Sequence, residues 1–371
     1  MPDNSTRQEE AKRYQALKNR LMLISLALQG ALLCLAIAAG WTWLFKSWAG
    51  FLGLAFSPWA PVFFYFLIFS LYLLLLEFPL NVYSGYVLEK RFGLSSQDFK
   101  GWLWQDSKKQ VLSFLFSAVL VEALYFLLRS FSENWWLFAW AGWFAVTVLI
   151  GKFAVVLFLP LFYKSTRLED ASLRGKITGL LEKYHFPVKD IYVINLSKTT
   201  RKANAAFTGI GSTRRVLLAD TLLEHFTHGE IETVVAHELG HCKKRHLVKG
   251  VIYNTAVSLV VFYAAYLALK HWAAPLGFES PADIAAFPLL GLVAFAAGFI
   301  LMPAGNAYSR FHETEADDFA LKECPDRGAF ISALKKLGSQ NLADFEPHPL
   351  VEFFLYSHPS LGKRISRAEK S

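Results

Sequence analysis

The sequence is poor in cysteine, with three in 371 residues, and they are widely separated: Cys34, Cys242 and Cys324. An odd, scattered set excludes a disulfide framework and a metal site built from cysteine pairs. We therefore expect three free thiols in a reducing compartment. Cys242 follows a histidine of the motif described below, but a one-residue step turns its side chain about 100° round a helix from that histidine.

Charged residues are also scarce, at 18% of the chain, whereas 54% of the residues are hydrophobic and the mean hydropathy is +0.31. This composition excludes a soluble protein with an ordinary polar surface. The net charge is +8, but no basic stretch is interleaved with aromatic residues, so we expect no nucleic-acid partner. The sequence also shows no internal repeats and no low-complexity segment.

Long apolar runs dominate the chain instead. A helix needs about 20 apolar residues to cross roughly 30 Å of hydrocarbon. Glu77, Glu122 and Lys152 interrupt the runs and either face a water-filled cavity or form an intramembrane structural pair. The six runs are 21–45, a run ending near residue 83, 111–128, 135–163, 250–269 and 287–308. We predict a mainly α-helical, polytopic membrane protein that has the lipid bilayer as its solvent.

Basic residues are unevenly distributed between the connections. Five lie in the first twenty residues and five more between the second and third runs, whereas the connections after the first, third and fifth runs carry few. The positive-inside rule then places the N-terminus, the segment 164–249 and the C-terminal tail in the cytoplasm. We expect no cleaved secretory signal, because the first apolar run is too long for one. The membrane would be a plasma or inner membrane, or the endoplasmic reticulum, depending on the host.

Residues 237–241 read His-Glu-Leu-Gly-His, the most informative motif in the chain. Two imidazoles four positions apart on a helix share a face and can bind one zinc ion at about 2.0–2.1 Å. Thr227 and Glu230 have the spacing of a capping box and precede an apolar stripe, which predicts the helix. The pattern is typical of a zinc hydrolase with Glu238 as its base. The plain alternative is an amphipathic helix with two histidines by coincidence.

A catalytic zinc takes three protein ligands and leaves one position for water, so a third donor is needed. The candidates are His246, His312, Glu313 and Glu315. We expect His246 to be a surface or interfacial histidine on the opposite side from the pair, because nine residues of helix turn through about 900°. Glu313 heads a helical segment that begins where the sixth run ends. Asp317 shares its face and can accept the outer N–H of a ligand histidine.

Zinc lowers the pKa of bound water to about 7. Glu238 can then take the proton as water attacks a scissile carbonyl, and can pass it to the departing amine. The tetrahedral oxyanion needs a further donor, for which His358 is a candidate. A histidine before a proline, as here, is otherwise a common turn residue.

The segment between the fourth and fifth runs has its own pattern. A helix is predicted around 173–184 and breaks at Pro187. Three β-rich runs follow at 191–195, 204–210 and 214–219, and we predict a small antiparallel sheet that leads into the metal-binding helix. The edge of such a sheet can hold a peptide as an extra strand, but the runs also fit a plain structural hairpin.

Several separated motifs resemble the membrane-integral CaaX prenyl protease 1 family, zinc metalloproteases of peptidase family M48. The motifs are 237–241, 309–317, Lys-Ala-Asn-Ala-Ala-Phe at 202–207, Tyr-Ser-His-Pro at 356–359, and 76–84 followed by 87–94. The resemblance covers nearly the whole chain. It implies a transmembrane helical barrel enclosing a water-filled chamber, with a gluzincin-like zinc protease domain. We divide the chain into a membrane domain, 1–163, with four transmembrane helices, and a protease domain, 164–371, interrupted by two more at 250–269 and 287–308.

The resemblance also implies roles for individual residues. The ligands of one Zn²⁺ per chain would be His237, His241 and Glu313. Glu238 would be the base and Asp317 the carboxylate behind a ligand histidine. Asn204 and His358 match positions that contact substrate or stabilise the transition state in the family.

The implied activity is that of an integral-membrane zinc metalloendopeptidase acting on peptides or proteins, which removes the C-terminal tripeptide of prenylated CaaX-type substrates. One alternative is a membrane quality-control zinc protease of broad specificity, against which the segment 76–94 argues. Another is a catalytically silent scaffold with structural zinc, which would need a fourth protein ligand. Eukaryotic members usually have seven spans, so six imply that one early span is missing.

Overall fold

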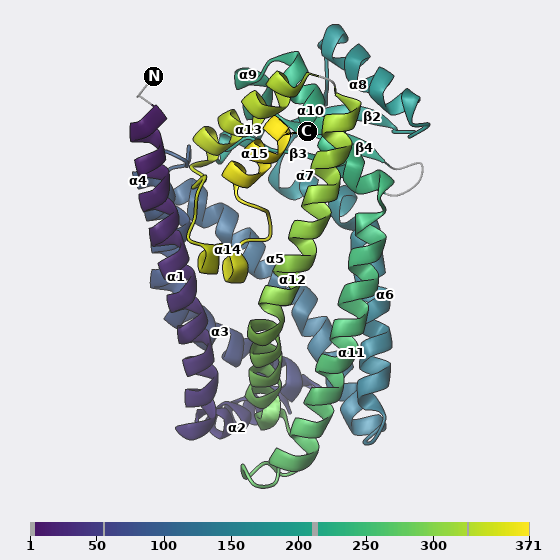
Figure 1. Ribbon diagram of the computed structural model, residues 1–371. Helices are drawn as coiled ribbons and strands as arrows, with labels where there is room; N and C mark the ends of the chain where they lie inside the picture. Colours follow the sequence, from purple (N-terminus) through teal and green to yellow (C-terminus); the bar gives the residue numbers. More distant parts are fainter. Residues whose placement is uncertain (1–3, 55, 210–213, 325, 371) are drawn as a thin grey trace.

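The computed structural model describes residues 4–54, 56–209, 214–324 and 326–370. Long helices run side by side along most of its length, and a small sheet with shorter helices lies at one end (Figure 1). The N-terminal half contributes α1 (Asn4–Ala38), α2 (Trp41–Gly53), α3 (Ala60–Val82), a π-helical turn η1 (Tyr83–Val87), α4 (Leu88–Arg91), α5 (Phe99–Ser130), α6 (Trp135–Leu157) and α7 (Leu159–Phe162).

Among the described residues, six helices are long and apolar enough to cross a membrane, which confirms the six predicted spans. They are Thr6–Ala38, Ala60–Arg91, Phe99–Ser130, Trp135–Phe153, His246–Trp272 and Ile284–Glu323. The first span ends earlier than the apolar run because Gly40 takes φ +76°, and the chain turns there into the short helix α2. The protein is therefore a multi-pass, membrane-integral protein.

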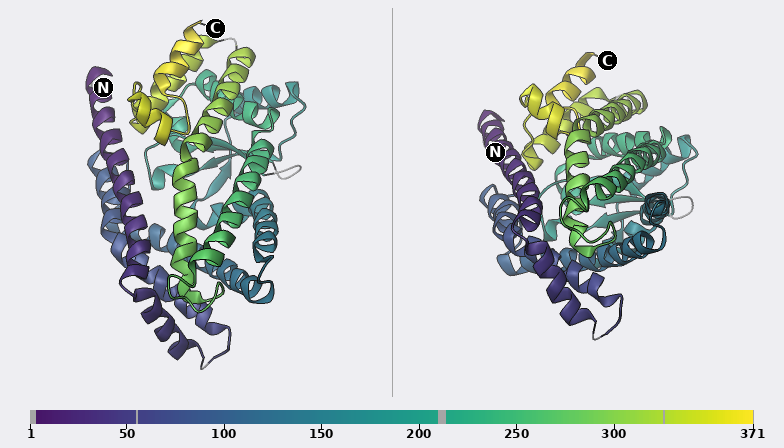
Figure 2. Two further views of the ribbon diagram at one scale, coloured as in Figure 1. Left: turned by 60° about the horizontal axis from the view of Figure 1, so that its bottom comes forward. Right: turned by 90° about the horizontal axis from the view of Figure 1, so that it is seen from below.

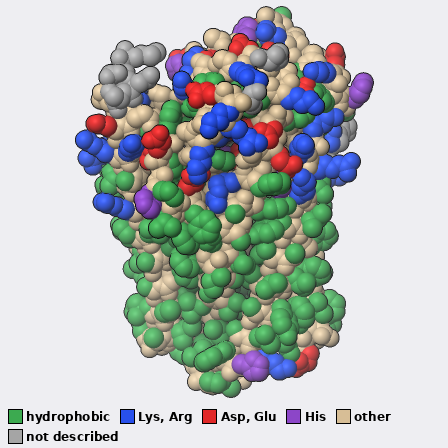
Figure 3. Space-filling view, viewed as in Figure 1, with side chains coloured by type: hydrophobic (Ala, Val, Ile, Leu, Met, Phe, Trp, Pro, Cys, Tyr) green, Lys and Arg blue, Asp and Glu red, His purple; other side chains and the backbone are tan. Residues whose placement is uncertain are grey.

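The surface divides into an apolar part over the long helices and a charged part at the other end. Hydrophobic side chains cover the lower part of the molecule in Figure 3, whereas Lys and Arg gather over the end that carries the sheet. Within the described part of the chain, no ion pair joins Glu77, Glu122 and Lys152 to one another, so the structural-pair interpretation has no support. Cys34, Cys242 and Cys324 are free thiols, as predicted.

The C-terminal half of the sequence combines strands with helices. Its elements are β1 (Ser165–Arg167), α8 (Ala171–Lys183), β2 (Asp190–Ile194), η2 (Leu196–Lys198), β3 (Ala205–Thr208), β4 (Arg215–Ala219), α9 (Asp220–His225), α10 (His228–Lys243), α11 (His246–Trp272), η4 (Ile284–Ala286), α12 (Phe287–Glu323), α13 (Arg327–Asn341), α14 (Pro349–Leu355) and α15 (Leu361–Lys370). The predicted helix near 173–184 is α8, and α10 begins at the predicted capping box of Thr227 and Glu230.

The sheet is mixed, so the prediction of an antiparallel sheet was wrong. The strand order is β1-β2-β4-β3. β3 and β4 form an antiparallel pair, but β4 lies between β3 and β2 and runs parallel to β2, from Asp190 opposite Arg215 to Ile194 opposite Ala219. β1, too short for its pattern to be read, adds antiparallel to β2. β3 is left as an edge strand, and Ile210, the predicted end of its run, lies outside the described residues.

The helix α12 is continuous over 37 residues, although it contains Pro303. The prediction that Glu313 heads a separate helix after the sixth span was therefore wrong. Glu313 instead lies well inside one rod that begins in the membrane part and ends at the sheet-bearing part, as Figure 2 also shows. A rigid helix of this kind fixes the height of the Glu313 side chain relative to α10.

The two largest hydrophobic cores among the described residues lie in these two parts. One joins the sheet to α8, α10, α13 and α15, and Ile231, Val235 and Leu239 of α10 are among its fully buried members. The other joins the long helices around Tyr65, Tyr125 and related side chains. The apolar face of α10 is thus fixed in the first core, which leaves its opposite face for the histidines.

Candidate active site

Close packing of α10 against α12 brings the candidate residues together. A Cβ atom placed on Gly240 would lie 3.1 Å from Cα of Ala316 and 3.1 Å from Cβ of Phe319, closer than side chains normally pack. Glycine inside the His-Glu-Leu-Gly-His motif therefore allows the two helices to approach. The approach places Glu313 of α12 beside His237 and His241 of α10.

The three donor groups are spaced as ligands of one ion. Nε2 of His237 and Nε2 of His241 are 3.2 Å apart, and each lies 3.3 Å from a different carboxylate oxygen of Glu313. Ligands at about 2.0–2.2 Å from a tetrahedral ion are separated by roughly 3.4 Å. Oε2 of Glu313 is buried without a hydrogen-bond partner, which a bound cation would satisfy. The nitrogen and oxygen donors thus fit a divalent metal.

Asp317 lies behind the first histidine. Its Oδ1 is 2.8 Å from Nδ1 of His237, on the side of the ring away from Glu313. Both carboxylate oxygens also accept hydrogen bonds from Arg364 of α15, at 2.8 and 2.6 Å. Burial lowers the pKa of His237, but its contacts with Asp317 and Glu313 outweigh burial and raise the pKa to about 9. A metal must therefore displace a proton from this ring.

Glu238 lines the same cavity as His237 and Glu313. Burial raises the pKa of its carboxyl group, although the neighbouring histidines act in the opposite direction. A carboxylate whose pKa is shifted toward neutrality is better suited to accept a proton and return it than an exposed glutamate.

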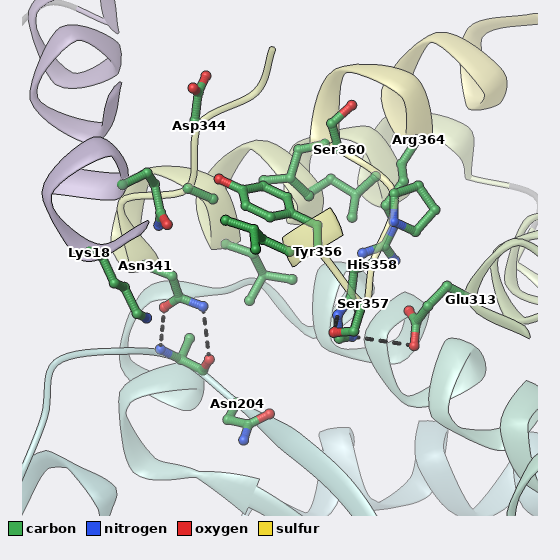
Figure 4. A pocket seen from close by; sticks show the side chains of 18 of the residues that line it. Lys18, Asn204, Glu313, Asn341, Asp344, Tyr356, Ser357, His358, Ser360 and Arg364 are labelled. Atoms are coloured by element: carbon green, nitrogen blue, oxygen red, sulfur yellow. Dashed lines mark hydrogen bonds and ion pairs between the residues drawn. The ribbon is translucent and has the colours of Figure 1, made fainter. Parts of the chain in front are cut away.

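The cavity has a volume of about 910 Å³ and extends from His237 to α1. His358 points toward Glu313 in Figure 4, with its Nε2 3.3 Å from Oε1, while its Nδ1 lies 2.9 Å from the Ser357 hydroxyl. Asn204, immediately before β3, also lines the cavity. Glu77, Glu122 and Lys152 are not among the residues that line it, so this cavity gives no support to the water-filled interpretation of those charges.

Two positioning residues could not be recognised from any pattern in the sequence. Arg364 is 47 residues from Asp317, and nothing in the spacing of the C-terminal basic residues connects the two. Asn341, at the end of α13, accepts a hydrogen bond from the backbone N–H of Ala203 at 2.9 Å and donates one to its C=O at 3.3 Å, which fixes the chain next to Asn204 (Figure 4).

The prediction for His246 was wrong. α10 ends at Lys243, and Arg245 takes φ +55°, so His246 begins a new helix and the rotation expected for one helix does not apply. His246 is only 6% exposed, and its ring turns back to His241. His312 and Glu315, the other candidate ligands, group with His246 and not with the His237 pair.

A His-Glu-x-x-His helix completed by a carboxylate from a membrane helix defines the protein as a membrane-embedded metalloprotease. Residues 167–371 match the model of peptidase family M48, and residues 4–164 match that of the CAAX prenyl protease N-terminal region, described as five membrane helices. The chain belongs to peptidase family M48 and resembles the CAAX prenyl protease 1 branch, as the motifs predicted.

Individual relatives support the same assignment. The chain is 30% identical to the uncharacterized metalloprotease YhfN of Bacillus subtilis over 97% of this chain and 85% of that protein. It is 31% identical to CAAX prenyl protease 1 of Saccharomyces cerevisiae over 79% of this chain and 68% of that protein. The crystal structure of S. mikatae Ste24p superposes with a TM-score of 0.86 at 26% identity, covering 97% of this chain and 88% of that one.

Proposed function

We propose that this chain is a zinc metalloendopeptidase in which His237, His241 and Glu313 hold one Zn²⁺ and Glu238 is the catalytic base. The observation that carries the proposal is the set of 3.2–3.3 Å separations between the three donors, beside a cavity that Glu238 also lines. Zinc at this position would polarise a carbonyl and lower the pKa of bound water. Three ligands leave a position for that water, which favours catalysis over the structural-zinc scaffold.

The protein's own side chains supply the remaining steps. Glu238 accepts the proton of the attacking water and delivers it to the departing amine. His358 faces the same space and donates a hydrogen bond to the oxyanion. Asp317 and Arg364 keep the His237 ring oriented through its outer nitrogen.

The edge of the sheet supports a way of holding the substrate. β3 is paired with β4 on one side only, and Ala205, its first residue, lines the cavity beside Asn204. Extended peptides bind to such an edge through backbone hydrogen bonds. We infer that the peptide adds to β3 and that Asn204 fixes it next to the scissile bond.

The walls of the cavity favour a lipid-modified tail as substrate. Leu21, Met22 and Leu26 of α1 and Leu80 of α3 line the same space as the histidines. An isoprenoid chain on a cysteine near the cut site can lie against this apolar wall. Together with the likeness to CAAX prenyl protease 1, this supports removal of the C-terminal tripeptide from prenylated CaaX-type substrates.

A farnesylated CaaX peptide should be cleaved with a kcat/KM at least about 10-fold above that of the same peptide without the lipid. Burial of only about 100 Å² of apolar surface contributes about 2.5 kcal/mol, which exceeds the free energy that a 10-fold preference requires. Leu26→Ser should reduce the preference, whereas Leu23→Ser, on the same helix but outside the cavity, should not. Equal cleavage of both peptides would favour the broad quality-control protease.

Replacing His358 by Gln or Phe separates its proposed role from mere packing. We expect His358→Phe to lower kcat by about 10²–10³, with little change in KM or zinc content, because the lost donor acts on the transition state. His358→Gln, which keeps an N–H donor, should recover part of the rate. Steady-state kinetics and metal analysis of both variants check this, and an unchanged kcat in His358→Phe would contradict the role.

A further inference from the structure

His241, the second histidine of the motif, has its own support on the side away from Glu313. Its Nδ1 lies 2.9 Å from Nδ1 of His246, and Nε2 of His246 lies 3.1 Å from Oε2 of Glu315. Nζ of Lys249 is 3.3 Å from the same carboxylate oxygen. The four residues form a continuous polar chain, and the His246 side chain within it is 5% exposed.

The distances fix where the protons lie when His241 binds a cation. Nε2 of His241 faces Glu313 and must then be unprotonated, so its proton is on Nδ1. That N–H donates to Nδ1 of His246, which must accept. The remaining proton of His246 is then on Nε2 and donates to Glu315. This one set of tautomers gives every hydrogen bond between these four residues a donor and an acceptor.

The geometry of α12 explains why an intermediate histidine is needed. Glu315 is two residues from Glu313, about 200° round the helix, so it faces away from the metal-binding cluster. It cannot reach His241 itself. The positive φ of Arg245 starts α11 at an angle that brings His246 into the gap.

A second metal site at His246, His312 and Glu315 fits the structure less well, although their donor atoms lie within 4.8 Å of one another. The rings of His246 and His312 are stacked at 4.2 Å with an interplanar angle of 11°, so their lone pairs lie in parallel planes and do not converge on one point. Both nitrogens of His246 already have partners, and Lys249 supplies a positive charge at Glu315.

We propose that His246 and Glu315 are positioning residues for the metal ligand His241, as Asp317 is for His237. Each ligand histidine then has a carboxylate of α12 behind it, and each carboxylate has a cation, Arg364 in one case and Lys249 in the other. The proposal rests on the zinc site proposed above. His246 and Glu315 orient the His241 ring and raise its basicity toward the metal.

The test measures zinc affinity by chelator competition in full-length protein carrying Glu238→Gln, so that the readout does not depend on activity. His246→Leu should weaken zinc binding about 10- to 100-fold. His246→Gln, whose amide can accept from His241 and donate to Glu315, should recover most of the affinity. His271→Leu, an exposed histidine on the same helix, is the matched control and should bind zinc normally.

A double-mutant cycle tests the connection itself. Glu315→Gln alone should weaken zinc binding. In the His246→Leu background it should cause little further loss of affinity, because the hydrogen bonds from His241 to Glu315 are already interrupted there. The absorption spectrum of bound Co²⁺ should shift in both single variants and return toward wild type in His246→Gln. Glu315→Gln and His246→Gln retain the packing volume and carry the test if His246→Leu does not fold.

Three results would overturn the inference. They are wild-type zinc affinity in folded His246→Leu, equal losses in His246→Leu and His246→Gln, and a second zinc per chain that disappears with His246. Failure of the zinc site as a whole looks different, because the Glu238→Gln protein would then bind no stoichiometric zinc even with His246 intact.

Discussion

Glu238→Gln should lower kcat for peptide hydrolysis by about 10³-fold or more while leaving the protein folded and zinc-loaded. The amide has nearly the shape of the carboxylate, but it cannot accept the proton of the attacking water. Glu238 is not one of the three grouped donors, so the metal site should survive. The variant therefore separates the base from the ligands.

Single-turnover cleavage of a farnesylated CaaX peptide, together with metal analysis, checks this expectation. Glu232→Gln is the matched control, because Glu232 lies on the same helix, pairs with Lys176 at 3.5 Å and does not line the cavity. It should retain wild-type turnover. Undiminished hydrolysis by Glu238→Gln would remove Glu238 from the mechanism.

Glu313→Gln should abolish both zinc binding and hydrolysis. The neutral amide gives up the charge that faces two histidines and replaces one carboxylate oxygen with an N–H group that cannot bind a metal. Since loss of a residue behind a ligand costs about 10- to 100-fold in affinity, loss of a ligand should cost more than about 100-fold.

Zinc content after dialysis and chelator competition measure this loss. Glu323→Gln provides the control, because Glu323 lies on the same helix and pairs with Lys183 at 2.7 Å, away from the cavity. A Glu313→Gln protein that keeps full zinc and normal turnover would show that the third ligand lies elsewhere.

Features that depend on local sequence spacing could be predicted from the sequence. His237 and His241 share a face because four residues are close to one turn, and the capping box of Thr227 fixes where that helix begins. The six spans followed from the lengths of the apolar runs. The position of Glu313 followed from the resemblance, but its place inside a continuous helix did not, because the polar stretch after residue 308 made the run appear to end.

Features that depend on tertiary contacts could not be predicted in the same way. Arg245 adopts φ +55° without the glycine or asparagine that would signal it, so the break before His246 has no local signature. The parallel pairing of β2 with β4 depends on where the β3–β4 pair docks, which strand composition does not encode. Arg364 reaches Asp317 only because α15 packs against α12. The cytoplasmic orientation stays a prediction based on the basic residues.

Zinc-edge X-ray absorption on the purified protein, with and without Glu313→Gln, tests the proposed metal site most directly. We expect one zinc per chain with two imidazole nitrogens at about 2.0–2.1 Å, one carboxylate oxygen at about 2.0–2.2 Å and one exchangeable light ligand. Glu313→Gln should lose this signal. A zinc shell with four protein ligands, or one that Glu313→Gln leaves unchanged, would contradict the proposed site.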